Sequence, residues 1–294
     1  MPSLKKIKFV TDSVADLPAH LIEKWDITVV PAVVTYGGNS YDDDGVQFVR
    51  EDVYAALEGM DNLPTTAAMS SETSREGIEA AFNKGADHVI ILTIPAKLSG
   101  VYNSMRIAMR EFPEDRVTLI DSYQLSMGVG WQALIGAETA AQTGSVAQTV
   151  AAIKQVQKHQ DTYALLSTLK YLRRSGRVSG LTASIGALLD LKIVLKVGDG
   201  ELKSEAKVRT NKRAINTTLD LVRSHAPFDR MAIMHANDLD RAQMLLDRLK
   251  DVAPPEVEIG TICPAIGVHG GPGIIGVTTV SKGWKDALGI RNTG

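Results

Sequence analysis

The chain has 294 residues, of which 44% are hydrophobic and 22% charged, and this composition excludes a disordered, collagen-like or coiled-coil chain. Its 32 lysines and arginines against 34 aspartates and glutamates give a net charge of −2, which excludes a global basic surface for nucleic acid or an anionic membrane. The length predicts one large domain or two medium-sized ones.

Strand-like and helix-like segments alternate through the first half of the chain. The expected strands are short, are rich in Val, Ile and Thr, and cover residues 7–11, 27–34, 89–94 and 117–120. The expected helices cover residues 17–25, 50–57, 75–84, 101–111 and 131–142. A capping box from Thr73 to Glu76 supports the third of them. Because continuous apolar strands are buried on both faces, the alternation predicts a mostly parallel sheet covered by helices.

The second half of the chain is richer in adjacent strands. A helix is expected over residues 145–159, and strands are expected at residues 163–167, 192–197, 201–208, 231–235, 256–262 and 274–280. Two further helices fit residues 212–224 and 238–250. Gly198-Asp199-Gly200 predicts a hairpin, because Asp-Gly tolerates the positive φ angles of a tight turn. We therefore expect an α/β fold with two domains, an N-terminal α/β domain at 1–158 and a mixed α/β domain at 159–294.

The cysteine content and the apolar segments bear on the location of the protein. Cys263 has no internal disulfide partner, and residues 1–13 contain no apolar core of a secretory signal. The longest apolar runs, residues 89–95 and 262–268, are far shorter than the roughly 20 residues that cross a bilayer. We expect a cytoplasmic protein without stable membrane insertion.

Common catalytic, nucleotide and metal motifs do not explain the chain. The sequence has no P-loop, no H-E-x-x-H, no C-x-x-C and no G-x-S-x-G. Residues 271–276 spell G-x-G-x-x-G but lead into an expected strand, whereas a dinucleotide-binding turn opens a helix. Asp42-Asp43-Asp44-Gly45 lacks the spacing of a calcium loop and is interpreted as a solvated turn. We expect no metal, no cofactor and no nucleic acid partner.

Polar residues cluster at five expected strand-to-helix or strand-to-loop junctions. These clusters are at residues 11–13, 64–66, 98–100, 121–122 and 269–273. Ligands of open α/β sheets bind outside the carboxyl ends of the strands, and hydroxyls beside free N–H groups favour an anionic oxygen. Helix capping explains any one cluster better than a ligand does. The five together favour a site for a carboxylate or a phosphate.

The same segments carry a family resemblance. The chain has TDS at 11–13, Pro-x-Thr at 64–66, LSGVYNS at 98–104, DS with S-x-G-x-G at 121–130, L-x-x-L-R-R-S-G-R-V-S at 169–179 and HGGPGIIGV at 269–277. In this order the motifs resemble the DegV family over residues 7–280. The resemblance implies a bacterial protein that holds one long-chain fatty acid, such as palmitate or oleate, between its two domains. It also implies a partner, a separate ATP-dependent fatty acid kinase that converts the presented carboxylate into an acyl phosphate for phospholipid metabolism.

Residue roles follow from the resemblance. Thr66 and Ser99 correspond to head-group hydroxyls, and His269 corresponds to a histidine beside the carboxylate. The expected neighbours of the head group are Thr65, Gly100 and Asn103. The family commonly has Thr-Ser-Gln-Pro-Ser where this chain has Thr66-Ala67-Ala68-Met69-Ser70, and Thr where it has Val101. The key hydroxyls are therefore kept, whereas polar neighbours that affect head-group geometry and kinase recruitment are lost.

Burial of an acyl tail would supply binding energy without any catalytic group. About fourteen methylenes at ~0.8 kcal/mol each give roughly 11 kcal/mol for a sixteen-carbon acid. Association costs about 4–15 kcal/mol, so micromolar or tighter binding is compatible with this tail. The candidate tunnel residues, each of which also suits an ordinary core, are Ile185, Leu188, Leu189, Leu191, Ile193 and Ile266.

Arg173, Arg174 and Arg177 place three guanidinium groups within five residues. We interpret them as a surface patch that docks the kinase or an anionic product, and a solvated turn is the nearly equal alternative.

Two other functions fit parts of the same pattern. An acyl hydrolase would use Ser99 as nucleophile and His269 as base, although the sequence offers no carboxylate to orient His269. A lipid-sensing regulatory protein would use the same pocket without any chemistry.

Overall fold

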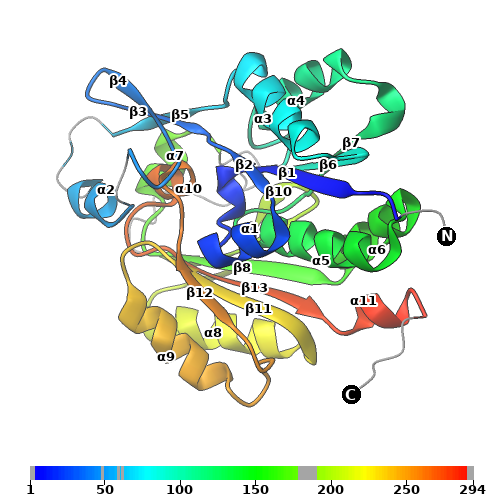
Figure 1. Ribbon diagram of the computed structural model, residues 1–294. Coiled ribbons are helices and arrows are strands. Elements are labelled where there is room, and N and C mark those ends of the chain that lie inside the picture. Colours follow the sequence, from blue (N-terminus) through cyan, green and yellow to red (C-terminus); the bar gives the residue numbers. More distant parts are fainter. Residues whose placement is uncertain (1–3, 48–49, 58–59, 61–62, 178–190, 290–294) are drawn as a thin grey trace.

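The computed structural model describes residues 4–47, 50–57, 60, 63–177 and 191–289 of the chain (Figure 1). Within these residues the strands form a four-stranded, a six-stranded and a three-stranded sheet. The α/β fold class expected from the sequence is confirmed. The tunnel candidates Ile185, Leu188 and Leu189 lie outside the described residues.

The four-stranded sheet is entirely parallel, as the alternation of segments predicts. Its order is β2 (Thr28–Val30), β1 (Ile7–Asp12), β6 (His88–Thr93) and β7 (Val117–Asp121). All six residues of β6 are buried, because helices cover both faces of the sheet. The chain runs from β1 to β2 on one side and then crosses to β6 on the other, so the order of the strands reverses beside β1. Such a reversal opens a crevice at the carboxyl ends of the strands.

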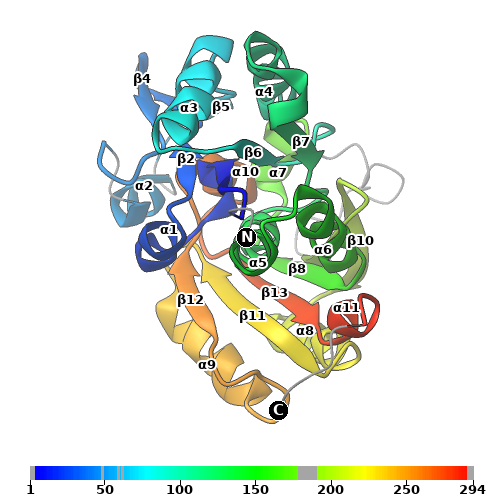
Figure 2. The same cartoon turned by 45° about the vertical axis from the view of Figure 1, so that its right-hand side comes forward.

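Helix α5 (Met127–Thr143) lies between the two large sheets. It contacts β1 and β6 of the parallel sheet and β8, β11 and β13 of the six-stranded sheet, and Figure 2 shows it in this central position. Most of its residues are buried, as expected for a helix that is apolar all round. Helices α3 (Ser71–Asn83) and α4 (Val101–Ala108) cover the opposite face of the parallel sheet, and α6 (Val146–Lys158) packs beside α5.

The six-stranded sheet is mixed and contains the strands expected in the second half of the chain. Its order is β10 (Glu201–Val208), β9 (Lys192–Gly198), β8 (Gln160–Leu166), β13 (Ile275–Ser281), β11 (Phe228–His235) and β12 (Glu258–Thr261). Asp199 and Gly200 both have positive φ in the turn between β9 and β10, which confirms the predicted hairpin. Helices α8 (Asn211–Arg223) and α9 (Leu239–Leu249) cover the outer face, and the inner face turns toward α5.

The three-stranded sheet corrects one expected strand. Residues 27–34 do not form a continuous strand: the chain leaves β2 at Val30, and a separate strand β3 (Val33–Tyr36) begins after Pro31. Proline has no N–H to donate to a strand ladder, so the chain turns there into another sheet. β3 pairs antiparallel with β4 (Asn39–Asp42) and β5 (Thr65–Ala67).

Other helix boundaries differ from expectation in small ways. Helix α3 begins four residues before the predicted start, because Ser70 caps it by accepting a hydrogen bond from the Thr73 N–H at 2.9 Å. The expected helix at 101–111 is α4 followed by the short η2 (Met109–Glu111). The remaining elements are η1 (Ser13–Ala15), α1 (Ala19–Trp25), α2 (Arg50–Leu57), η3 (Glu114–Arg116), α7 (Lys170–Arg174), α10 (Pro264–Gly270) and α11 (Gly283–Asp286).

The division of the chain at residues 158 and 159 stays a prediction. The parallel sheet lies before this point and the six-stranded sheet after it, but α10 packs against η1, α2, β3 and β5 of the first half. The second half thus supplies a helix to the first. In the described part of the chain, no helix is both long enough and apolar enough to span a membrane.

Close packing of α10 against α2 requires a glycine at position 267. A Cβ there would lie 2.0 Å from the Tyr54 hydroxyl oxygen, and the Tyr54 ring is buried. We expect Gly267→Ala to lower the free energy of unfolding by about 1–3 kcal/mol, because the ring must move and the strain exceeds the helix propensity gained. Urea denaturation measures this change.

Gly198→Ala is the matched control, since the nearest atom to an added Cβ there is Lys203 Nζ at 3.9 Å. Equal stability of the two variants would contradict the close packing of α10.

Candidate functional site

A cavity opens between the carboxyl ends of the parallel strands and the inner face of the six-stranded sheet. Its empty volume is about 1040 Å³, counting its opening to solvent. Apolar side chains from both halves of the chain form most of its wall, including Val14, Ile94, Leu98, Leu125, Leu166, Leu195, Val197, Met234, Ile262, Ile266 and Ile274. The cavity therefore lies where the reversal of strand order predicts a ligand site.

Thr66 and His269 form the first polar contact in this wall. Thr66 comes from β5 and His269 from the last turn of α10, and the Thr66 hydroxyl lies 2.7 Å from Nε2 of the imidazole. Among the described residues, Nδ1 of His269 has no hydrogen-bond partner although it is buried. Because each ring nitrogen is a donor or an acceptor, this nitrogen has an unused hydrogen-bonding position.

The loop that carries Ser99 lies against the strand that carries Thr66. The space where a Cβ of Gly100 would sit is 3.4 Å from the Cβ of Ala68, so the two segments touch. Ser99 lines the cavity, and its hydroxyl accepts a hydrogen bond from the Val101 N–H at 3.3 Å. Thr66, Ser99 and His269, which the sequence singles out, therefore line the same cavity.

Arg177 is a fourth polar residue of the cavity wall. Burial lowers the pKa of His269 to about 4, and the positive charge of Arg177 contributes to this shift. The imidazole is therefore neutral at pH 7. Among the described residues that line the cavity there is no aspartate or glutamate. A guanidinium, two hydroxyls and an imidazole without an opposing acid suit an anionic oxygen ligand.

The other residues expected around the site are placed differently. Thr65, Gly100 and Asn103 are exposed and do not line the cavity in the described structure. Ala67 lines it instead. Of the described tunnel candidates, Ile266 lines the cavity, whereas Leu191 and Ile193 do not.

The three arginines do not form one surface patch. Arg173 and Arg174 are exposed at the end of α7, but Arg177 lines the cavity, and its guanidinium donates to the Ser175 carbonyl oxygen at 2.8 Å. Arg177 is therefore separated from Arg173 and Arg174 by Gly176, which has a positive φ of 74°, and a docking role for the three arginines stays a prediction.

Two of the five polar clusters at strand ends have structural roles. Asp12 accepts hydrogen bonds from the N–H groups of Val14 and Ile94, which join the ends of β1 and β6. Ser13 accepts a bond from the Ala32 N–H, and Asp121 accepts bonds from Ala96 and Tyr123. Asp12 caps η1, so the capping interpretation is right for residues 11–13, whereas Asp121 stabilises the loops after β6 and β7 rather than a helix start.

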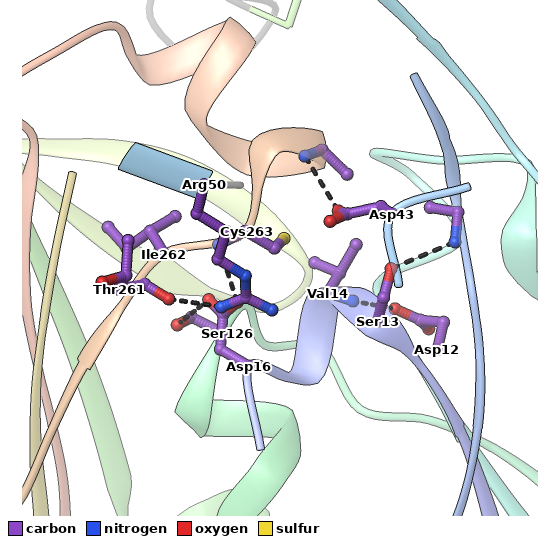
Figure 3. A network of polar contacts seen from close by, with 12 residues as sticks. Asp12, Ser13, Val14, Asp16, Asp43, Arg50, Ser126, Thr261, Ile262 and Cys263 are labelled. Atoms are coloured by element: carbon purple, nitrogen blue, oxygen red, sulfur yellow. Dashed lines mark hydrogen bonds and ion pairs between the residues drawn. The ribbon is translucent and has the colours of Figure 1, made fainter. Parts of the chain in front are cut away.

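Asp16 is the centre of a buried polar network beside the cavity (Figure 3). Its carboxylate accepts hydrogen bonds from the Ser126 hydroxyl at 2.6 Å and the Cys263 N–H at 2.8 Å, and Arg50 lies 3.3 Å away. Burial raises the pKa of Asp16 to about 6, although Arg50 and the hydrogen-bond donors oppose this change. Asp16 does not stand out in the sequence, because nothing local distinguishes it from a helix-capping aspartate.

Asp43 corrects the interpretation of the acidic turn. Its side chain is buried rather than solvated, and it accepts a hydrogen bond from the Ala265 N–H at 3.0 Å (Figure 3). The pKa of Asp43 is raised by this burial. Asp44, in contrast, is exposed and accepts local N–H bonds as a turn residue does. Within the described residues, no group of three histidines, cysteines or acids is arranged to hold a metal ion.

Comparisons with known proteins agree with this architecture. A family model described as "Uncharacterised protein, DegV family" matches residues 6–282. A DegV domain-containing protein of Streptomyces coelicolor is 32% identical over 283 residues, which cover 95% of this chain and 99% of that protein.

Solved structures with the same two-domain fold are also similar. A structure described as fatty acid binding of a DegV family protein from Thermus thermophilus has a TM-score of 0.87 and 29% identity, and it covers 94% of this chain and 99% of that chain. DegV of Bacillus subtilis, described as a fatty acid binding protein, has a TM-score of 0.84 and 26% identity, over 95% of this chain and 100% of that chain.

The environment of His269 predicts an unusual titration. We expect its ring to titrate near pH 4 in the ligand-free protein, because burial and Arg177 disfavour the charged imidazolium. A carboxylate bound beside the ring favours the charged form, so its pKa should rise when a fatty acid is added. NMR titration of the ring measures both values, with His269→Ala to assign the signal. A ring that titrates near 6.5 and does not respond to the ligand would contradict both expectations.

Proposed function

Because this chain belongs to the DegV family, we propose that it binds one long-chain fatty acid, such as palmitate or oleate, in the cavity between its parallel sheet and its six-stranded sheet. The carboxylate lies beside Thr66, Ser99 and His269, and the acyl chain occupies the apolar part. The observation that carries this proposal is the composition of the cavity wall, which is mostly apolar. Its most exposed polar residues all suit an anion, and they are Thr66, Ser99, Arg177 and His269. No aspartate or glutamate is among the described residues that line the cavity.

The burial of these groups supports an orientation for the ligand. The polar residues of the cavity wall that suit an anion are all partly exposed, namely Thr66, Ser99, Arg177 and His269. Apolar side chains of the wall, such as that of Leu166, are buried. A carboxylate at the partly exposed end keeps some contact with water and with a partner. The tail then occupies the interior, where each buried methylene contributes about 0.8 kcal/mol.

The same geometry favours binding over hydrolysis. A serine nucleophile needs a base within hydrogen-bond reach and a third group that orients the base. Here Nε2 of His269 contacts Thr66, the Ser99 hydroxyl accepts from the backbone, and Nδ1 has no partner among the described residues. The imidazole is therefore arranged to hydrogen-bond a ligand oxygen rather than to deprotonate Ser99.

We further propose that the protein presents the carboxylate to a separate ATP-dependent fatty acid kinase in the cytoplasm, which forms the acyl phosphate. The partial exposure of the head-group residues supports access by such a partner. Arg173 and Arg174 are exposed on α7, whose segment continues directly to Arg177 at the cavity wall. These two arginines are therefore our candidates for kinase docking.

Loss of either head-group hydroxyl should weaken fatty acid binding. We expect Thr66→Ala or Ser99→Ala to cost about 1.5–3 kcal/mol, or roughly 10- to 150-fold in Kd, because each removes a hydrogen bond to a charged acceptor. Isothermal titration calorimetry with palmitate and oleate measures the effect. Thr35→Ala on the neighbouring strand β3 is the control, since its hydroxyl contacts Ser40 outside the cavity. Unchanged affinity in the double variant would remove both hydroxyls from the site.

Reversal of charge at Arg173 and Arg174 should slow acyl phosphate formation without weakening fatty acid binding. Opposite charges across an interface mainly accelerate association, so the rate should depend on salt in the wild type and less in the variant. The measurement compares phosphorylation by the kinase with calorimetric binding. Lys212→Glu with Arg213→Glu on α8 changes the net charge equally at another exposed site. Equal phosphorylation rates for the two double variants would show that the α7 arginines lie in a solvated turn and do not dock the kinase.

A further inference from the structure

The cavity has a second polar region, far from His269. Thr162 of β8 and Thr278 of β13 both line the cavity, and both are buried. They are directly paired across the two antiparallel strands, and their hydroxyl oxygens are 3.2 Å apart. The two hydroxyls are partners for each other, but a purely aliphatic tail makes no hydrogen bond with either of them.

Strand register separates the two polar regions. Ile274, directly before β13, and Gly276 and Thr278 on this strand line the cavity in turn, and Ile274 lies next to Gly270, the neighbour of His269. The four residue steps from 274 to 278 span about 13 Å in extended backbone. A carbon–carbon bond of about 1.5 Å at an angle of about 111° advances an extended chain by about 1.25 Å. Thr278 therefore lies about ten bonds along a fatty acid whose carboxylate is beside His269.

Two buried glutamines, Gln124 and Gln160, lie near the threonine pair but are not among the residues that line the cavity. Among the described residues, Gln124 Oε1 and both amide atoms of Gln160 are buried and have no hydrogen-bond partner. Gln160 precedes Thr162 by two residues, so it lies on the same face of β8. Gln124 Oε1 and the Thr162 hydroxyl both lie within 3.0 Å of the point where a Cβ of Gly128 would be. The protein around the threonine pair is therefore polar as well.

We propose that the threonine pair forms a subsite for a hydroxyl group carried by the acyl chain, so that the preferred ligand is a fatty acid hydroxylated near its middle. This inference rests on the proposed fatty acid binding and names the substrate class of that site. The hydroxyl of such a ligand both donates and accepts, and the Thr162–Thr278 pair leaves one threonine proton available to it. One polar region then binds the carboxylate, and the other binds the hydroxyl at a fixed distance along the acyl chain.

A comparison of two ligands tests the subsite without any substitution. Stearate and 12-hydroxystearate differ only in the hydroxyl, and calorimetry gives their dissociation constants for the wild type. We expect 12-hydroxystearate to bind about tenfold more tightly, because a hydrogen bond of roughly 1.4 kcal/mol corresponds to that ratio. Equal or weaker binding of 12-hydroxystearate would overturn the inference and leave fatty acid binding intact.

Substitutions locate the source of the preference. Thr162→Val and Thr278→Val keep the shape of each side chain and remove its hydroxyl, so the tenfold preference should fall to about one while stearate affinity stays equal or rises. Thr279→Val is the matched control, since Thr279 is also buried but faces the other side of the sheet. If the preference for 12-hydroxystearate survives in both Thr162→Val and Thr278→Val, or disappears in Thr279→Val, the threonine pair does not bind the ligand hydroxyl.

The outcomes distinguish this inference from the proposed function. If the wild type binds stearate but shows no preference, the subsite is wrong and the function stands. If it binds neither acid, the proposed function fails and the subsite fails with it. The wild-type comparison decides the matter even when a valine variant does not fold, and the melting temperature of each variant identifies that case.

Discussion

The carboxylate of Asp16 connects the parts of the chain that together make the cavity. It accepts hydrogen bonds from Ser126, which precedes α5, and from the Cys263 N–H, which precedes α10, and it pairs with Arg50 of α2. These segments come from both halves of the sequence. A buried carboxylate is costly unless its oxygens are hydrogen-bonded, so these contacts can exist only when all the segments are assembled. The position of α10, and of His269 on it, therefore depends on Asp16.

The cavity follows from the layers around α5. This helix separates the parallel sheet from the six-stranded sheet. Beyond the N-terminus of α5 a cavity remains between these sheets, and it is lined by side chains of β8, β9 and β13 and of the loops after β1, β6 and β7. Most of these side chains are apolar, so the space favours a hydrocarbon. Its polar groups are hydroxyls, an imidazole that is neutral at pH 7 and Arg177. Such groups hold an anion by hydrogen bonds and charge, and the histidine lacks the oriented partner that catalysis by Ser99 needs.

Local sequence patterns predicted the elements that are formed by contacts between neighbouring residues, and the strands that are buried along their whole length. The parallel strands, the helices on the sheet and the Asp199-Gly200 hairpin are of this kind. The patterns also identified Thr66, Ser99 and His269, through their place in polar clusters at expected junctions and through the family resemblance, although His269 lies in the last turn of α10 and Thr66 within β5. They did not predict α10, a short helix with two glycines that is stabilised by packing against α2. The inward position of Arg177, the burial of Asp43 and the pairing of Thr162 with Thr278 depend on contacts between distant segments, which no local pattern encodes.

The central claim is that the cavity holds one fatty acid for each chain, and native mass spectrometry of the purified protein tests it most directly. The binding energy of a buried acyl tail predicts that a fatty acid copurifies. The spectrum should show a protein species heavier by the mass of one fatty acid, which disappears after delipidation and returns with one equivalent of added stearate. A protein that carries no lipid after purification and shows no adduct with added stearate would contradict the claim.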